Sequence, residues 1–303
     1  MMYPEPPEKE AYAMRDYVIM TDSCCDLNAY MAQQMDLYVL PLMLHMDGKN
    51  YPNMLDGSAI SFEEFYQKMR SGKLATTSAV NVGQFEDAMR EVLSQGKDIV
   101  CLSFSSALST TYQSAVIAAN EVIGDFPESR IYVVDTLCAS LGQGLLLYLA
   151  HQQKQNGLTA DQLAAWVELN KGRICHWFTV DDLNYLKMGG RVSATTALVG
   201  TMLSIKPVMH MSDEGKLTAV GKARGRKASL KALVDAAERL AIEPENQTMF
   251  ICHADCEAEA RWLAEELETR LGVKTVYINY IGPVIGSHAG PNTIGLFFIG
   301  SER

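Results

Sequence analysis

The feature that most constrains the fold of this chain is an alternation of short apolar runs with helical segments. YVIMT at 17–21, DIVCLSF at 98–104 and RIYVV at 130–134 are runs typical of buried strands, and polar residues follow each of them. The later part of 105–120 and a long apolar segment from about Ala139 have helical character. Strand, polar turn and helix in succession predict βαβ units and a parallel sheet wound to one hand.

Local signals predict further elements in the same half. Ser61 can cap a helix because Glu64 stands at the capping-box position, and another helix is expected behind Asn81, running to about Ser94. LYVLPLMLHM at 37–46 is a second extended stretch. Polar residues collect where the predicted strands end, and open parallel sheets bind ligands at that edge.

The pattern loosens after Gly157, where one helix is expected to reach about Gly172. Two short strands around the turn DEGK form a predicted antiparallel hairpin. The other predicted elements are strands ICHWFTV, TMFICH, KTVYINY and TIGLFFIG, and a helix from about Glu257 to Leu271. These elements predict a second α/β unit in the C-terminal half.

The length of 303 residues favours two domains over one. We predict an α/β fold with an N-terminal extension at 1–16, an N-terminal parallel-sheet α/β domain at 17–165, and a smaller C-terminal α/β (α+β) domain at 166–303. A ligand site is expected between the two domains.

Charge and hydropathy exclude several classes of function. A net charge of −10 opposes a general role on nucleic acid or on anionic membranes, so we expect no nucleic-acid partner and at most transient membrane contact. The start MMYPEPPEKEAYAMRDY lacks the basic and apolar parts of a secretory signal, and LGQGLLLYLA is far shorter than a membrane span. The expected location is the cytoplasm.

The cysteines indicate neither disulfides nor a metal site. Their number is seven, they are scattered, and no CxxC pair occurs, which favours reduced thiols. Cys252, His253 and Cys256 follow no common zinc spacing, so strand-end packing is the better interpretation and no metal is predicted. Phosphate-binding glycine motifs, G-x-S-x-G and HExxH are also absent.

Hydroxyl side chains are the remaining chemical signal. They form three groups expected in loops: 76–78, 105–111, and Ser287 beside His288 in the glycine-rich loop GPVIGSHAGPNTIG. Such residues routinely cap helices. Three groups together, with a histidine in a glycine loop, also predict neutral donors around an anionic head group at a helix N-terminus.

Six segments resemble the successive signatures of the DegV family, in order and over nearly the whole chain. They are MTDSCCDL, TTSAVNVGQF, SSALSTTYQSA, VDDLNYLKMGGRVS, KPVMHMSDEGKL and GPVIGSHAGPNTIGL. The resemblance implies a two-domain DegV-like fold that buries a long-chain fatty acid, such as palmitate, stearate or oleate, in a tunnel, with no cofactor. It further implies a carrier without catalytic residues, which presents the carboxylate to a separate ATP-dependent fatty acid kinase subunit for phospholipid synthesis. An acyltransferase is a further candidate partner.

The resemblance also assigns roles to residues. The carboxylate-binding positions fall on Thr77, Ser109 and His288, with Ser106 beside them. Arginines linked to phosphate handling or kinase contact fall on Arg191 and on Arg224 or Arg226 in the basic run KARGRKASLK. The chain departs from the family where Ala79 and Val80 follow Ser78 in place of the usual TSQP, and where Thr110 replaces a glycine.

The sequence leaves open an alternative function and the residues that line the tunnel. A serine hydrolase using Ser109 or Ser106 with His288 as base is the alternative function, although no motif supplies a residue that orients the histidine. Apolar runs such as ALVGTMLSI at 197–205 could line a tunnel, but methionine-rich segments are more often core.

Overall fold

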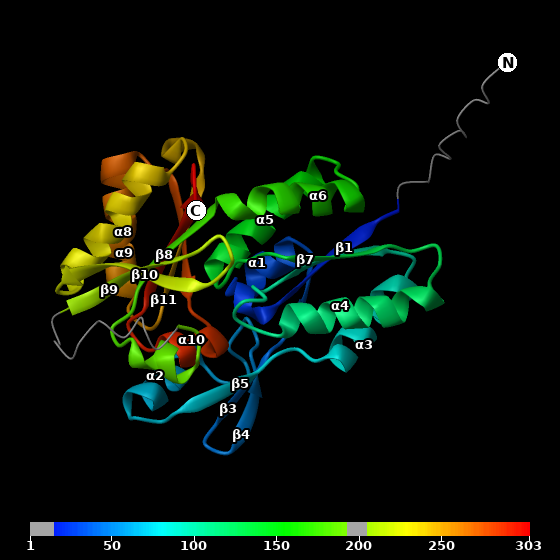
Figure 1. Ribbon diagram of the computed structural model, residues 1–303, viewed down its shortest axis with the longest axis horizontal. Coiled ribbons are helices and arrows are strands. Elements are labelled where there is room, and N and C mark those ends of the chain that lie inside the picture. The colour runs from blue at the N-terminus through cyan, green and yellow to red at the C-terminus, as the bar shows by residue number, and fades with distance from the viewer. Residues whose placement is uncertain (1–14, 193–204) are drawn as a thin grey trace.

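The structure, a computed structural model, describes residues 15–192 and 205–303 (Figure 1). Its first sheet is parallel and has the order β2-β1-β6-β7. The strands are β1 (Tyr17–Asp22), β2 (Leu37–Leu40), β6 (Asp98–Ser103) and β7 (Ile131–Asp135). The predicted βαβ architecture of the N-terminal half is confirmed. Most of the expected extension at 1–16, like most of the run at 197–205, lies outside the described residues.

Helices cover both faces of this sheet. Every residue of β1 and β6 is buried, as the continuous apolar runs predict. Helices α3 (Val82–Ser94) and α4 (Thr111–Val122) share one apolar cluster with β1 and β6. Helices α5 (Leu141–Gln155) and α6 (Ala160–Asn170) pack with the residues that point to the opposite face. The helix predicted behind Asn81 is α3, and a capping box of Asn81 and Gln84 starts it. Ser61 caps α2 as predicted, because its side chain accepts from the amide of Glu64.

The second sheet is mixed, with six strands in the order β10-β9-β8-β13-β11-β12. Only the pair β11 and β12 is parallel. Helices α8 (Arg226–Leu240) and α9 (Glu257–Leu271) cover its outer face (Figure 1). Its strands are β8 (Ile174–Thr179), β9 (Ile205–Met211), β10 (Leu217–Arg224), β11 (Thr248–His253), β12 (Thr275–Tyr280) and β13 (Ile294–Ile299).

Helix α5 lies between the two sheets and joins them. One apolar cluster contains Leu145 of α5, Val100 of β6 and Phe250 of β11. A Cβ atom at Gly142 would lie 2.1 Å from Nε2 of His176, so only glycine allows α5 to approach β8 this closely. The two-domain α/β layout therefore has an extensive apolar seam, while the division at residues 165 and 166 stays a prediction.

A small antiparallel sheet of order β4-β3-β5 was not predicted. It comprises β3 (Met43–Met46), β4 (Lys49–Pro52) and β5 (Ala75–Ser78), and it neighbours α1 (Ala29–Gln34) and α2 (Phe62–Arg70) in sequence. The stretch 37–46, predicted as one extended segment, is interrupted near Pro41, so β2 and β3 join different sheets. The three hydroxyl residues at 76–78 were expected in a loop. They lie on β5, where pairing with β3 fixes their backbone.

The glycine-rich segment before the last strand was predicted to be a loop, which is wrong for residues 283–289. These residues form α10 (Pro283–Ala289), and the predicted strand TIGLFFIG follows as β13. Proline at the first helical position suits a helix start, because the missing N–H has no partner there. Gly290, with φ of +85°, ends the helix. His288 therefore lies in the last turn of α10, and α7 (Asn184–Met188) packs against this helix.

Candidate functional site

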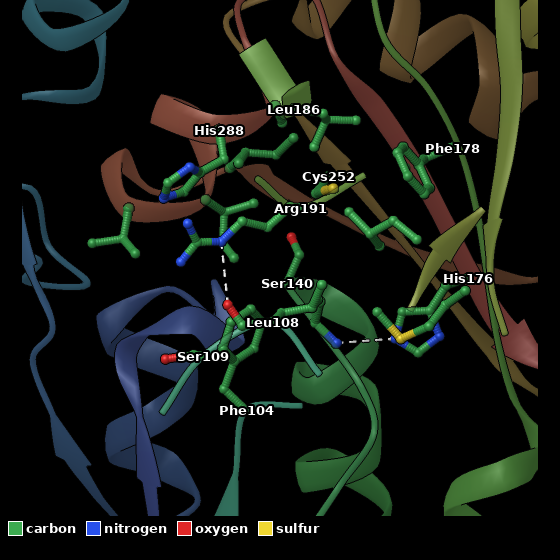
Figure 2. A pocket seen from close by; sticks show the side chains of 18 of the residues that line it. Phe104, Leu108, Ser109, Ser140, His176, Phe178, Leu186, Arg191, Cys252 and His288 are labelled. Carbon is green, nitrogen blue, oxygen red and sulfur yellow. Dashed lines mark hydrogen bonds between the residues drawn. The ribbon is translucent and has the colours of Figure 1, made fainter. Parts of the chain in front are cut away.

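A cavity of about 440 Å³ lies between the parallel sheet, the mixed sheet and α10 (Figure 2). The parallel sheet contributes residues that follow the carboxyl ends of β2, β6 and β7, which is the edge predicted to hold a ligand. The volume falls within the range of roughly 300 to 1,000 Å³ that is typical of small-molecule sites. The cavity is therefore large enough for an organic ligand.

Apolar side chains form most of the cavity wall. They come from the parallel-sheet loops, from strands β8, β9, β10, β11 and β13 of the mixed sheet, and from α7 and α10. This composition suits a ligand that is mainly hydrocarbon, because removing apolar surface from water is favourable. The larger members are Leu42, Phe104, Leu108, Phe178, Leu186, Met211, Leu217, Ile281, Val284, Ile285 and Phe297.

Thr77 and His288 meet at one end of the cavity. Oγ1 of Thr77 lies 2.8 Å from Nε2 of His288, and both side chains are partly buried. Burial, and secondarily the charge of Arg191, lower the pKa of His288 to about 4. The imidazole is therefore neutral near pH 7, and it can either donate to the threonine or accept from it.

The position of His288 is fixed by the packing around α10. A Cβ atom at Gly189 would lie 2.3 Å from Nδ1 of His288, so this glycine allows α7 to sit directly against the imidazole. At the other end of α10, the amide of Gly282 donates to Oδ1 of Asp26 at 2.9 Å. Nearby, the hydroxyl of Tyr66 donates to the carbonyl of Ile281 at 2.7 Å.

Arg191 is the permanent cation among the described residues that line the cavity. Its Nε atom donates to the carbonyl of Leu108 at 3.2 Å, and Nη1 donates to the carbonyl of Gly189. Partial burial lowers the pKa of Arg191, which nevertheless stays charged. Figure 2 shows Arg191 on the same side of the cavity as His288 and Ser109.

Ser109 and Ser106 also line the cavity. Oγ of Ser109 lies 2.9 Å from Oγ1 of Thr111 and accepts from the Thr111 amide at 3.2 Å, so it is also bonded to the first residue of α4. Ser106 is exposed, and its amide donates to Asp135. Thr110, the residue that replaces the usual glycine, is exposed and lines the same cavity. The structure thus gathers Thr77, Ser106, Ser109, Thr110, Arg191 and His288 around one space.

Arg224 and Arg226 do not line this cavity. Arg224 is an exposed residue at the end of β10. Arg226 begins α8, and its Nη2 atom lies 2.6 Å from Oε2 of Glu259 and donates to the carbonyl of Asn292 at 2.6 Å. The basic run at 222–231 is therefore divided between a strand and a helix, with one of its arginines in an ion pair.

A second, outer cavity of about 290 Å³ shares three lining residues with the first. Thr77, Arg191 and His288 line both spaces, so they form a partition between them. The outer cavity is otherwise lined by residues of β5, α7, α10 and the end of α2 with the loop after it. Two of these, Leu74 and Met188, are large apolar side chains exposed at 66% and 63%.

Three buried polar residues at this seam were missed from the sequence. Ser140, which lines the cavity, donates to Asp26 at 2.5 Å, and its backbone has φ of +51°. Burial is the main cause that raises the pKa of Asp26 to about 7. His176 is the third and also lines the cavity. Hydrophobic periodicity predicts neither the positive φ of Ser140 nor the burial of Asp26. The sequence therefore offered no signal for these residues.

Comparison with known proteins gives the lineage of this architecture. The model of a family described as "Uncharacterised protein, DegV family" matches residues 16–301. The chain belongs to the DegV family. A DegV domain-containing protein of Clostridium perfringens is 44% identical over 290 residues, which cover 96% of this chain and 99% of that protein.

Solved DegV structures share the fold over nearly the full length. A structure described as fatty acid binding of a DegV family protein from Thermus thermophilus superposes with a TM-score of 0.84 at 32% identity, covering 95% of this chain and 100% of the other. A stearic acid-binding protein from Eubacterium ventriosum gives a TM-score of 0.81 at 29% identity, covering 94% and 98%. Both neighbours are thus described as binding a fatty acid.

The alternative of a serine hydrolase gains no support from the site. Within residues 15–192 and 205–303, His288 is hydrogen-bonded to Thr77, and no hydrogen bond joins it to Ser109 or Ser106. A nucleophile and its base are expected within hydrogen-bond reach.

The described residues, 15–192 and 205–303, contain no cluster of three metal-ligating side chains and no helix long and apolar enough to cross a membrane.

Proposed function

We propose that this DegV protein binds one long-chain fatty acid, such as palmitate, stearate or oleate, with the acyl chain inside the cavity and the carboxylate beside Thr77, Ser109 and His288. Ser106 lines the same cavity. The observation that carries the proposal is the Thr77–His288 pair, placed next to Arg191 at one end of a largely apolar cavity. Relatives of the same fold are described as fatty-acid-binding.

Burial of the acyl chain supplies most of the affinity. Each buried methylene contributes about 0.8 kcal/mol, so a palmitate chain gives on the order of 12 kcal/mol before ordering costs. A hydrogen bond to the head group contributes roughly 0.5 to 3 kcal/mol, the upper part applying to charged groups. The hydroxyl and imidazole groups therefore determine mainly where the carboxylate lies.

The polar end suits a carboxylate because it combines donors with one nearby charge. When Nε2–H of His288 donates to Thr77, the threonine hydroxyl is free to donate to the carboxylate, and the two bonds strengthen each other. Ser109 can donate in the same way while its oxygen still accepts from the Thr111 amide. Arg191 adds a positive charge at this end of the cavity.

The outer cavity supports a carrier role for the protein. Because Thr77, Arg191 and His288 separate it from the inner cavity, a carboxylate held by them would lie directly behind an opening to the surface. The proposed partner is a separate kinase subunit, which phosphorylates the carboxylate with ATP in the cytoplasm and supplies acyl phosphate for phospholipid synthesis. An acyltransferase is the proposed acceptor, and the exposed Arg224 remains a candidate contact for the kinase.

Binding of matched ligands to delipidated protein tests this proposal. Palmitate, methyl palmitate and hexadecanol share the chain and differ at the head group. Palmitate should bind roughly tenfold more tightly than the other two, because the charged head group gains hydrogen bonds that they cannot reproduce. Equal affinity for all three ligands would refute the carboxylate site, and failure of all three to bind would refute the acyl-binding role.

A further inference from the structure

His176 lies on the opposite side of the cavity from the polar end. Figure 2 shows His176 and Phe178, both on β8, facing the cavity on the side away from Arg191, His288 and Ser109. Cys175 and Trp177, which alternate with them along β8, pack on the other face of the sheet against α8. Strand alternation thus directs His176 into the cavity.

Backbone contacts occupy both ring nitrogens of His176. Nδ1 lies 2.8 Å from the carbonyl of Ile174, and Nε2 accepts from the amide of Ala139 at 3.2 Å. A carbonyl can only accept and an amide N–H can only donate, so the neutral Nδ1–H tautomer is the one that satisfies both contacts. Burial lowers the pKa of His176 well below its ordinary value, in agreement with this geometry.

The imidazole of His176 therefore has no free donor or acceptor for a ligand. Only its carbon edge and ring face remain, and an aromatic surface of this kind suits a hydrocarbon end better than a charged one. His176, although polar, thus presents an apolar surface to the cavity. This excludes His176 as a second head-group site.

His176 is also held rigidly in place. It is 3% exposed and packs edge-on against Phe297 with ring centroids 5.3 Å apart. On its other side α5 leaves no room, since a Cβ atom at Gly142 would lie 2.1 Å from Nε2. The ring cannot withdraw toward α5 when a longer ligand enters.

We propose that His176 closes the tail end of the cavity and limits the length of the acyl chain that the protein accepts. The inference rests on the proposed fatty-acid function and adds a specificity-determining residue to it. A chain that reaches the ring with its carboxylate held at the Thr77–His288 end has no further space. Each methylene beyond that length must stay out of the cavity or displace the head group.

Competition between stearate and eicosanoate tests this role in the His176→Ala variant. Each methylene that gains a buried place strengthens binding roughly fourfold, so the affinity ratio should shift toward eicosanoate by on the order of tenfold relative to wild type. His253→Ala is the matched control, because His253 is a buried histidine on β11 that does not line the cavity. Its ratio should stay at the wild-type value.

An unchanged ratio in a folded His176→Ala protein would overturn the inference and leave the fatty-acid function intact. Failure of the wild-type protein to bind either acid would refute the underlying function instead. Stearate labelled with carbon-13 at its terminal methyl gives a test in the wild-type protein. Nuclear Overhauser contacts from this methyl to the His176 ring are expected, and contacts confined to other side chains would contradict the placement.

Discussion

Thr77 on β5 and His288 on α10 are 211 residues apart in sequence, yet their side chains lie 2.8 Å from each other. One belongs to the small antiparallel sheet and the other to a short helix that precedes the last strand of the mixed sheet. Their contact therefore requires both halves of the chain to be folded and packed together. The proposed position of the carboxylate depends on this pair.

Replacement of His288 should affect head-group position more than retention of the acyl chain. In His288→Ala, the Thr77 hydroxyl loses its partner and the carboxylate is less well held, while the apolar wall is largely unchanged. Kinase-dependent phosphorylation of bound palmitate should fall about tenfold or more, and palmitate affinity by only a few-fold. Transfer assays and equilibrium binding on the same preparation measure the two effects, and equal losses would contradict a positioning role.

Gly189→Ala should mimic the loss of His288 without touching the ligand. The new Cβ would lie 2.3 Å from Nδ1 of His288, so the imidazole must move away from Thr77. Gly172→Ala is the matched control, because no heavy atom lies within 4 Å of its added Cβ. Phosphorylation should fall in the first variant and stay at the wild-type level in the second. Wild-type behaviour of a folded Gly189→Ala protein would count against the packing argument.

Replacement of Arg191 should affect ligand binding, whereas replacement of Arg226 should affect the stability of the fold. Arg226→Gln removes a partly buried ion pair with Glu259, so unfolding free energy should fall by about 1 to 3 kcal/mol with palmitate affinity unchanged. Arg191→Gln removes the positive charge at the cavity and should weaken palmitate relative to hexadecanol. Chemical denaturation and binding titrations measure the two variants side by side. The reverse pattern would overturn this assignment.

Stability should fall as the pH rises through the titration of Asp26. Burial raises the pKa of this carboxyl from 3.8 to about 7, so between these values the folded state binds more protons than the unfolded state. The contribution of Asp26 to the unfolding free energy should therefore decrease from about pH 4 to about pH 7, at roughly 1.4 kcal/mol per pH unit where the difference is one proton. His288, with its pKa lowered to about 4, contributes the opposite slope between pH 4 and pH 6.5.

Asp26→Asn isolates this contribution. The variant keeps one oxygen that can accept from the Gly282 amide and places an NH2 group where it can donate to the Ser140 hydroxyl, but it removes the titrating group. Asp22, whose pKa burial raises to about 6, remains in both proteins and provides a common background. Denaturant unfolding at several pH values should show the stability of wild type falling relative to that of the variant as the pH rises from about 4 to about 7. Parallel profiles would show that Asp26 does not titrate as described.

Local sequence signals predicted the elements whose causes are local. The apolar runs at β1, β6 and β7, the start of α3 behind Asn81 and the bounds of α9 depend on residues that are close in sequence. The helix at 283–289 was missed because its glycines indicate a loop, whereas Tyr66 and Asp26 hold its N-terminal end from distant parts of the chain. Tertiary contacts of this kind override local propensity.

The candidate site divides in the same way. Thr77, Ser109, His288 and Arg191 were identified through the family resemblance, and the structure brings all four to one cavity. The resemblance could not show that Thr77 and His288 bond to each other, because no local rule relates β5 to α10. The role of Arg226 as the partner of Glu259 depends on the packing of α8 against α9. His176 was invisible for a related reason, since its neutral state is set by two backbone groups.

Mass spectrometry of the lipid released from gently purified, then denatured, protein tests the central claim most directly. A buried acyl cavity that binds fatty acid should retain it through purification, so the account predicts free long-chain fatty acid at close to one molecule per chain. Protein that is folded, carries no fatty acid and takes up none when palmitate is supplied would contradict the account.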